Sequence, residues 1–172
     1  MTPCPLIKIR LMTKRDEPHW MAIQTDAYGR RFLETPEVFF NRLTVFPKGC
    51  WVAEHDYIVL AYLISHPWQI HSVPKLNDPD LQIPPNPNCY YIHSLTLLSK
   101  WQRRGIGRQM CEHVLQIAGK LGFTKITLTS VQGSHVFWSK CGFREMGEVT
   151  EVMKRKLASY GSGARFMIRE TA

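Results

Sequence analysis

The chain has 172 residues, 44% of them hydrophobic, and a formal net charge of +8 at pH 7. This length suits one domain with a substantial core. The sequence has neither an apolar run of 18 residues nor a charged-then-apolar signal at its start, so we expect no membrane span and no secretory leader. The five cysteines are scattered and form no Cys-x-x-Cys pair, which favours reduced thiols in a cytoplasmic protein without a metal site.

The first part of the chain predicts a strand followed by two helices. Residues 6–12 alternate apolar and basic side chains, as in a half-buried strand. Thr13 and Thr35 are the expected N-caps, and each is followed by a proline in the first helical turn. The two helices are expected to end at Tyr28 and Phe46, because glycine follows shortly after each of them.

A β-hairpin and a proline-rich segment come next. Residues 50–54 and 57–65 predict two strands joined by a tight turn. The segment 66–88 contains six of the 11 prolines, a density that excludes helix and central strand. A loop this long is usually functional or disordered, so its His66, Trp68 and His71 either line a pocket or lie on a mobile surface.

The most informative stretch is a strand that runs through a glycine-rich turn into a helix. Residues 89–98 are strongly β-prone, residues 102–108 read Gln-Arg-Arg-Gly-Ile-Gly-Arg, and apolar residues then recur at helical spacing up to Leu121. Free backbone N–H groups and the positive end of the helix dipole attract anions at such a helix start. The turn therefore predicts a ligand that carries phosphates.

The spacing of the glycines separates this turn from two better-known phosphate motifs. A dinucleotide-binding fingerprint needs a third glycine where Met110 stands, and a P-loop needs a Gly-Lys-Ser/Thr sequence that is absent. The pattern Gln102-x-x-Gly105-x-Gly107 after a strand instead resembles the pyrophosphate-binding motif of the GNAT superfamily of N-acetyltransferases.

The remainder of the chain strengthens this resemblance. The last elements are predicted to be a strand, a short helix and two strands, over residues 125–131, 135–141, 143–149 and 165–169. Phe137-Trp138 followed by Gly142-Phe143 is similar to the superfamily's Phe-Tyr-x-x-x-Gly-Phe, and Val131-Gln132-Gly133-Ser134 before Phe137-Trp138 resembles a bacterial GNAT subgroup.

The resemblance covers essentially the whole chain and implies one GNAT domain over residues 1–172. Its fold is α/β, with a mixed, mostly antiparallel sheet of about seven strands that is splayed between the fourth and fifth strands and has helices on both faces. The implied activity is direct transfer of an acetyl group from acetyl-CoA, as cosubstrate, to a primary amine of a small molecule or peptide. GNAT proteins need no metal and are frequently homodimers.

The same resemblance implies which residues contact the cofactor. The strand before the turn is expected to bind the pantetheine arm, and the turn to bind the pyrophosphate. Trp138 is expected to contact the cofactor from the place where the family often has a general-acid tyrosine, but indole carries no acidic proton near neutral pH. The expected contacts are Leu95, Thr96, Leu97, Gln102, Arg103, Arg104, Gly105, Ile106, Gly107, Arg108 and Trp138.

Acetylation also needs a proton acceptor, because alkyl amines are mostly protonated at pH 7. His93 stands where the family often has a catalytic glutamate, and imidazole is suited to accept a proton at this pH. Glu54, His135 and a water relay are the alternatives. Tyr160, in a glycine-flanked linker before the last strand, is the expected general acid.

Two other classes of protein compete with an enzyme. A non-catalytic CoA-binding regulator would explain why Trp138 replaces the usual acid. A nucleic-acid-binding module would explain the positive charge, but the charge gathers at the glycine turn, and no RNA-binding signature is present. The sequence therefore favours the acetyltransferase and argues against nucleic acid as a partner.

Overall fold

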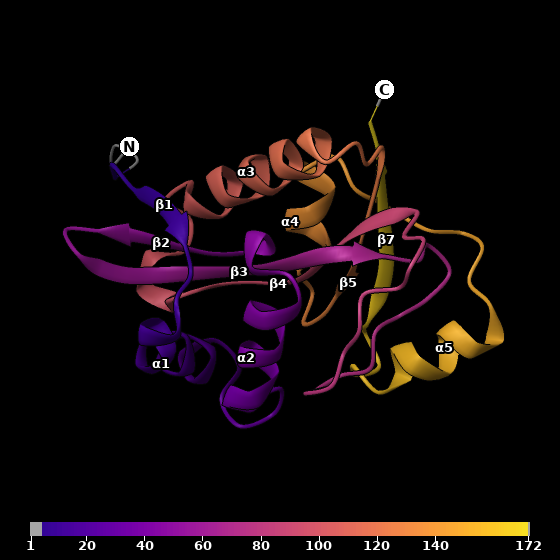
Figure 1. Cartoon of the computed structure of the whole chain (residues 1–172), viewed down its shortest axis with the longest axis horizontal. Coiled ribbons are helices and arrows are strands. Elements are labelled where there is room, and N and C mark those ends of the chain that lie inside the picture. The colour runs from indigo at the N-terminus through magenta and orange to yellow at the C-terminus, as the bar shows by residue number, and fades with distance from the viewer. Residues whose placement is uncertain (1–4, 172) are drawn as a thin grey trace.

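The computed structural model of the protein describes residues 5–171 and has a seven-stranded open sheet with the strand order β1-β2-β3-β4-β5-β7-β6 (Figure 1). The strands are β1 (Lys8–Leu11), β2 (Cys50–His55), β3 (Ile58–Trp68), β4 (Cys89–Leu97), β5 (Lys125–Ser130), β6 (Arg144–Glu145) and β7 (Arg165–Glu170). Neighbouring strands are antiparallel except for β4 and β5, which are parallel. The predicted mixed, mostly antiparallel sheet is confirmed.

Helices cover both faces of this sheet. In Figure 1, α3 and α4 lie over one face, and α1 and α2 lie over the other. The helices are α1 (Glu17–Tyr28), α2 (Pro36–Val45), α3 (Ile106–Lys120), α4 (His135–Lys140) and α5 (Glu151–Ala158), with short 3-10 turns η1 (Lys14–Asp16), η2 (Pro47–Gly49) and η3 (Ser99–Trp101).

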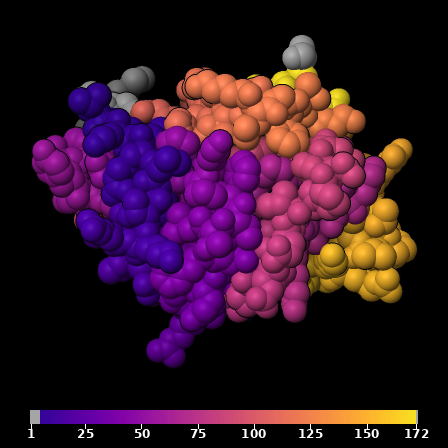
Figure 2. All heavy atoms as spheres, viewed as in Figure 1, coloured from indigo at the N-terminus to yellow at the C-terminus, as the bar shows by residue number. Residues whose placement is uncertain are grey.

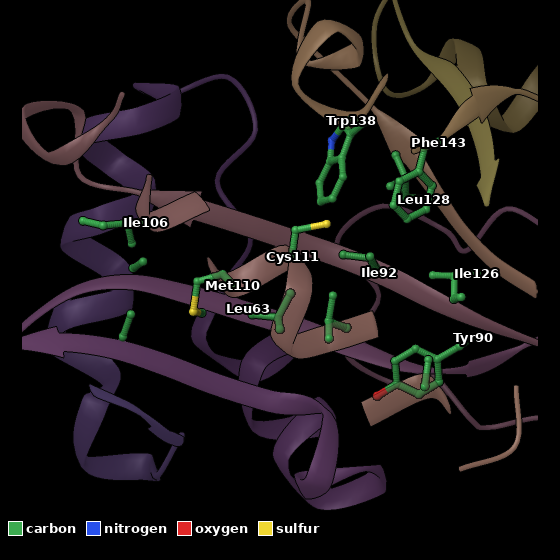
Figure 3. Close-up of a cluster of buried hydrophobic side chains, with 14 of the residues drawn as sticks. Leu63, Tyr90, Ile92, Ile106, Met110, Cys111, Ile126, Leu128, Trp138 and Phe143 are labelled. Atoms are coloured by element: carbon green, nitrogen blue, oxygen red, sulfur yellow. The ribbon is translucent and has the colours of Figure 1, made fainter. Parts of the chain in front are cut away.

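The apolar face of α3 forms the main core with the sheet. Ile106, Met110 and Val114 recur at helical spacing, are fully buried and pack against strand residues such as Ile92 and Leu128 (Figure 3). On the opposite face, α1 and α2 bury a second cluster in which the Trp20 and Phe39 rings stack with their centroids 5.1 Å apart. These two cores fix α1 and α3 on either side of β4.

Strands β4 and β5 separate after a short paired stretch. They pair only from Tyr90 to Ile92 of β4, so the rest of β4 is bonded to β3 alone. A β-bulge opposite Ile64 and Ser65 makes His93 an extra residue at the point where the pairing stops. Residues 93–97 therefore have a free edge on the β5 side, which confirms the predicted splay.

The C-terminal part differs from the expectation in two places. The linker before the last strand contains α5, and the strand expected over residues 143–149 is reduced to β6, two residues long. Thr150 caps α5 by accepting a hydrogen bond from the Met153 N–H, and Val149, Met153 and Leu157 recur at helical spacing in one apolar cluster, so a local signal for this short helix is present in the sequence.

The expected exclusion of proline from a central strand is wrong at Pro67. This residue lies near the end of β3 and pairs with Tyr90 of β4. Because the pairing of β3 with β2 ends at Ile64, Pro67 lies at a local sheet edge, where no partner strand requires its missing N–H.

Four of the five cysteines lie within the described residues 5–171. Cys50, Cys89 and Cys111 are buried free thiols, Cys141 is a partly exposed one, and Cys4 lies outside the described residues. Within residues 5–171, no helix combines the length and the apolar character needed to cross a bilayer.

Candidate active site

The glycine-rich turn is held in place at the start of α3. The Ser99 N–H donates to the Asp26 carboxylate at 2.6 Å, which ties the turn to α1. Arg103 and Gly105 both have positive φ values, 60° and 81°. At position 105 glycine adopts this left-handed conformation without strain. α3 begins at Ile106, so the unpaired N–H groups of its first turn lie where an anion is expected.

The basic side chains of this turn are exposed to solvent. Gln102, Arg103, Arg104 and Arg108 are all exposed. The Arg104 guanidinium lies over the Trp101 ring, 5.0 Å from its centroid, and Arg108 forms an exposed ion pair with Glu112 at 3.0 Å. The predicted phosphate contacts thus share one positively charged surface region.

Gly107 brings three elements of the predicted cofactor site together. A Cβ atom at this position would lie 3.2 Å from Phe137 of α4 and 4.0 Å from Leu97 of β4. The start of α3 thus meets the free edge of β4 and helix α4 at a point with no room for a larger side chain. The sequence predicted Leu97 and Gly107 as cofactor contacts, and the structure places them side by side.

A chain of hydroxyl groups connects α1 to the free edge of β4. Thr96 Oγ1 is 3.0 Å from the Tyr28 hydroxyl and 3.0 Å from Ser94 Oγ. Thr96 is 3% exposed, whereas Leu95 and Leu97 are partly buried. Of the three predicted cofactor contacts 95–97, Thr96 therefore offers a buried side-chain hydroxyl as well as its main-chain groups.

His93 forms a buried pair with Glu34, a residue in the connection between α1 and α2. His93 Nε2 lies 2.9 Å and 2.8 Å from the two carboxylate oxygens, and the side chains of His93 and Glu34 are 3% and 8% exposed. Glu34 was not predicted from the sequence. It is the only acidic residue between Tyr28 and Thr35, but nothing near it in the sequence indicates a pair with His93, 59 residues away.

A second histidine lies behind this pair. The His66 ring is fully buried, with its centroid 6.3 Å from that of His93 and 5.6 Å from that of Tyr91. Burial lowers the pKa of His66 to about 3, so its ring is neutral at physiological pH. The Nδ1 atom of His66 lies 3.0 Å from the Pro67 carbonyl oxygen. His66 was expected in a pocket wall or on a mobile loop, and it is instead part of the buried polar cluster.

Tyr160, the predicted acid, lies just after α5. Its hydroxyl donates to the Pro74 carbonyl at 2.6 Å, and the residue is 7% exposed. Burial raises the pKa of Tyr160 well above its usual value. In this structure the hydroxyl therefore fixes the proline-rich segment to the C-terminal part of the chain.

The proline-rich segment packs on the connection that carries Glu34. The Asn77 side chain accepts a hydrogen bond from the Thr35 N–H at 3.0 Å, and the Arg42 guanidinium donates to the Asp78 carbonyl at 2.9 Å. In Figure 2 the pink surface of this segment lies between the purple surface of the N-terminal helices and the yellow surface of the C-terminal region. Residues 69–88 are therefore an ordered wall beside the His93 cluster, and His71 is exposed on it.

The other predicted residues lie apart from this cluster. Glu54 of β2 is engaged by Arg10 at 2.8 Å and by Lys8 at 3.4 Å, and His135 is the first residue of α4. The Trp138 indole is 6% exposed and lies in the core beside Phe143 (Figure 3). The structure thus brings His93 to the free edge of β4, whereas Glu54 is committed to an ion-pair network on β1 and β2.

Comparison with known proteins identifies the family. Residues 17–143 match the sequence profile described as the acetyltransferase (GNAT) family, so the chain belongs to this family. No curated protein matches the chain.

Several solved structures have the same fold. The chain is similar to the loading GNATL domain of CurA from Lyngbya majuscula, with 12% identity over 96% of this chain and 98% of that chain and a TM-score of 0.79. It is similar to N-acetylglutamate synthase from Neisseria gonorrhoeae complexed with coenzyme A and N-acetyl-glutamate, with 17% identity over 97% of this chain and 35% of that chain and a TM-score of 0.72. It is also similar to the PaiA N-acetyltransferase from Thermoplasma acidophilum in complex with coenzyme A, with 12% identity over 96% of this chain and 99% of that chain and a TM-score of 0.69. At these identities the likeness shows the GNAT fold.

Proposed function

We propose that the protein is an acetyl-CoA-dependent N-acetyltransferase that moves the acetyl group directly to a primary amine of a small molecule or peptide. The observation that carries the proposal is the junction of an exposed, basic glycine turn with the free edge of β4, at which His93 lies. The complexes of coenzyme A with the synthase and with PaiA, two proteins of the same fold, support this choice of cosubstrate.

The residues of the junction suit the parts of acetyl-CoA. The backbone of 102–108, with Arg103, Arg104 and Arg108, would hold the pyrophosphate, because its N–H groups and guanidinium groups are donors that match phosphate oxygens. The free main-chain groups of 95–97 would hold the pantetheine arm and stabilise the carbonyl oxygen. The close approach at Gly107 is consistent with this, since it holds the start of α3 directly against Leu97 of β4 and Phe137 of α4, so that the two parts of the expected cofactor site are adjacent. Trp138 was predicted as a direct contact, but it is buried beside Phe143, so we propose that it acts on the cofactor by supporting α4.

The cosubstrate supplies a thioester, and the chain supplies the proton transfers. His93 removes a proton from the acceptor amine, directly or through water, so that the nitrogen can form a bond to the carbonyl carbon. The departing sulfur then takes up a proton, for which Tyr160 is the proposed acid. To act in this way the Tyr160 hydroxyl must exchange its hydrogen bond to Pro74 for one to the thiolate.

The remaining inferences from the sequence stay predictions. They are the domain boundaries 1–172, membership of the bacterial subgroup, a cytoplasmic location, a homodimer, and the use of the proline-rich segment 66–88 as part of the acceptor wall. The last of these is supported by the contacts that place this segment on the Glu34 connection.

The proposal is tested by incubating the purified protein with acetyl-CoA and a panel of polyamines, amino acids, aminoglycosides and peptides. We expect release of the CoA thiol together with an acetylated amine that mass spectrometry detects. Tight binding of CoA in calorimetry without turnover of any amine would contradict the proposal and favour a CoA-binding regulator. A salt-dependent gel shift with RNA or DNA would favour the nucleic-acid alternative.

A further inference from the structure

The hydrogen between His93 and Glu34 can be assigned to one atom. Burial raises the pKa of Glu34, but its pairing with His93, the charge of Arg42 and the hydrogen bond from the Asn77 N–H outweigh this effect and hold the pKa below its usual range. Glu34 is therefore ionised at neutral pH, and an ionised carboxylate only accepts hydrogen bonds. Since both carboxylate oxygens lie within 2.9 Å of Nε2, the hydrogen is on Nε2 of His93.

This assignment determines which ring nitrogen can act as a base. In a neutral imidazole one nitrogen carries the hydrogen and the other carries the lone pair, so Nδ1 of His93 has the lone pair. Nδ1 is buried and has no hydrogen-bond partner among residues 5–171. A buried acceptor without a partner is costly and calls for an explanation, and a catalytic role is one of the recognised explanations.

Glu34 itself is held from two sides. Both atoms of the Gln24 side-chain amide bind the Glu34 main chain, with Nε2 donating to the carbonyl at 2.7 Å and Oε1 accepting from the N–H at 3.1 Å. Gln24 is 1% exposed, and the Asn77 N–H donates to the Glu34 carboxylate at 3.3 Å. The carboxylate thus has a defined position before any substrate binds.

The other titratable groups around the pair do not replace Glu34 as its charged partner. Burial keeps His66 neutral and keeps the neighbouring tyrosines protonated. The permanent cation of the cluster is Arg42, whose charge acts on Glu34 and on His66. The groups that surround the pair are Tyr28 of α1, Arg42 of α2, Tyr62 and His66 of β3, Tyr91 of β4 and Tyr160 after α5.

We propose that Glu34 is the positioning residue of the base: it keeps the hydrogen of His93 on Nε2 and so directs the lone pair of Nδ1 to the acceptor amine. The inference rests on the proposed function, in which His93 is the base. The N–H bond of the ammonium group breaks, its proton passes to Nδ1 directly or through water, and the electron pair stays on the amine nitrogen. The imidazolium that forms is then stabilised by the carboxylate of Glu34.

The first test compares the kcat and the KM for acetyl-CoA of three variants across a range of pH. Glu34→Gln keeps the shape of the side chain and removes its charge, so we expect kcat to fall about a hundredfold while the KM for acetyl-CoA stays unchanged. The acidic limb of the rate profile should move to lower pH, because the imidazolium loses the charge that stabilises it. Glu34→Asp keeps the charge and should retain this limb with a smaller loss of rate. Glu37→Gln, which removes an exposed carboxylate three residues away, should behave as the unmodified protein.

The second test is a double-variant comparison. If Glu34 acts through His93, Glu34→Gln has no further effect on kcat in a His93→Ala background. Additive losses, or a lower unfolding temperature with an unchanged pH profile, would show that Glu34 is merely structural and would overturn the inference. An unaltered rate in His93→Ala alone would instead overturn the proposed base, so the two failures are distinguishable.

A third readout does not depend on activity. Nitrogen-15 NMR of the histidine-labelled protein reports which ring nitrogen carries the hydrogen, and the His93 signals are identified by their loss in His93→Ala. We expect His93 to be protonated on Nε2 in the unmodified protein and to show a mixture of tautomers in Glu34→Ala. A His93 ring with its hydrogen on Nδ1 would overturn the inference even if Glu34→Gln failed to fold.

Discussion

At the scale of single residues, His93 is the group whose removal should cost the most activity. His93→Ala should lower kcat by about two to four orders of magnitude, because the amine then lacks its proton acceptor. Affinity for CoA should stay nearly constant, since the predicted cofactor contacts are on the turn and on 95–97. Raising the pH should partly restore the rate, as more amine is then deprotonated without help. Steady-state rates from pH 6 to 10 and calorimetry with CoA check these expectations.

Tyr160 has a structural contact as well as a proposed chemical role, and Tyr160→Phe separates the two. The variant keeps the ring and loses the hydroxyl that donates to Pro74, so it should unfold more easily by about 1 kcal/mol. If Tyr160 is also the acid, kcat should fall by about a hundredfold or more. Tyr57→Phe is a suitable control, because Tyr57 is 96% exposed. A loss of stability with an unchanged kcat would leave Tyr160 as a structural residue.

At the scale of elements, the start of α3 and the free edge of β4 should determine cofactor binding. Gly107→Val places a Cβ atom 3.2 Å from Phe137, so the start of α3 or Phe137 must shift where the backbone N–H groups are expected to bind the pyrophosphate. Loss of two or three charge-assisted hydrogen bonds means about a hundredfold weaker binding of CoA or more. Gly119→Val is the matched control, because it makes the same change in the same helix with no other atom within 4 Å.

The proline-rich segment gives a second prediction at this scale. Asn77→Ala removes the side chain that accepts from the Thr35 N–H, so the wall of residues 69–88 should loosen beside Glu34. The KM for the amine should rise, while calorimetry with CoA should give an unchanged affinity. Gln82→Ala, at an exposed position of the same segment, is the control. Equal effects of the two variants on the amine would show that the segment plays no part in acceptor binding.

Elements defined by local signals were predicted well, and those defined by distant contacts were not. The strand, turn and helix of 89–121 follow from apolar spacing and from the glycines of the turn, all of which are neighbours in sequence. β3 reaches Pro67 only because β4 pairs with it there. α5 is the exception, because the Thr150 cap and the spacing of Met153 and Leu157 are local signals that the prediction did not use. The pairing of Glu34 with His93 joins residues 59 apart in the chain, so no local pattern indicates it.

At the scale of the whole molecule, charged side chains lie in two different environments, at the surface of the glycine turn and in the buried cluster around His93. The exposed arginines of the glycine turn face solvent, where they can attract an anionic ligand. The buried Arg42 and Glu34 lie instead among neutral side chains between α2 and the proline-rich segment. Removing an exposed arginine should therefore weaken CoA binding, whereas removing a buried charge should act on the fold and on the pair with His93.

The buried cluster also makes the stability of the protein depend on pH. The pKa of His66 is about 3 in the folded protein and near 6.5 in the unfolded chain, so the unfolded state binds more protons between these values. The contribution of the neutral His66 ring to the free energy of unfolding is therefore complete above pH 6.5, and it is lost as the pH falls toward 3. Glu34 and Asp16 have lowered pKa values in the folded protein. Their contribution to the free energy of unfolding is therefore lost mainly below about pH 4, where carboxylates of the unfolded chain take up protons.

The pH range from 7.5 to 4.5 therefore reports mainly on histidines whose pKa is lowered by burial, which are His66 and, in the same direction, His113. Over this range the midpoint of urea unfolding should fall clearly for the unmodified protein. It should fall less for His66→Asn, which has no group that gains a proton on unfolding at this position. An exposed histidine such as His71 provides the control, since His71→Asn should retain the full dependence on pH. Equal slopes for the unmodified protein and His66→Asn would show that the neutral, buried ring of His66 does not determine the stability of the fold in this range.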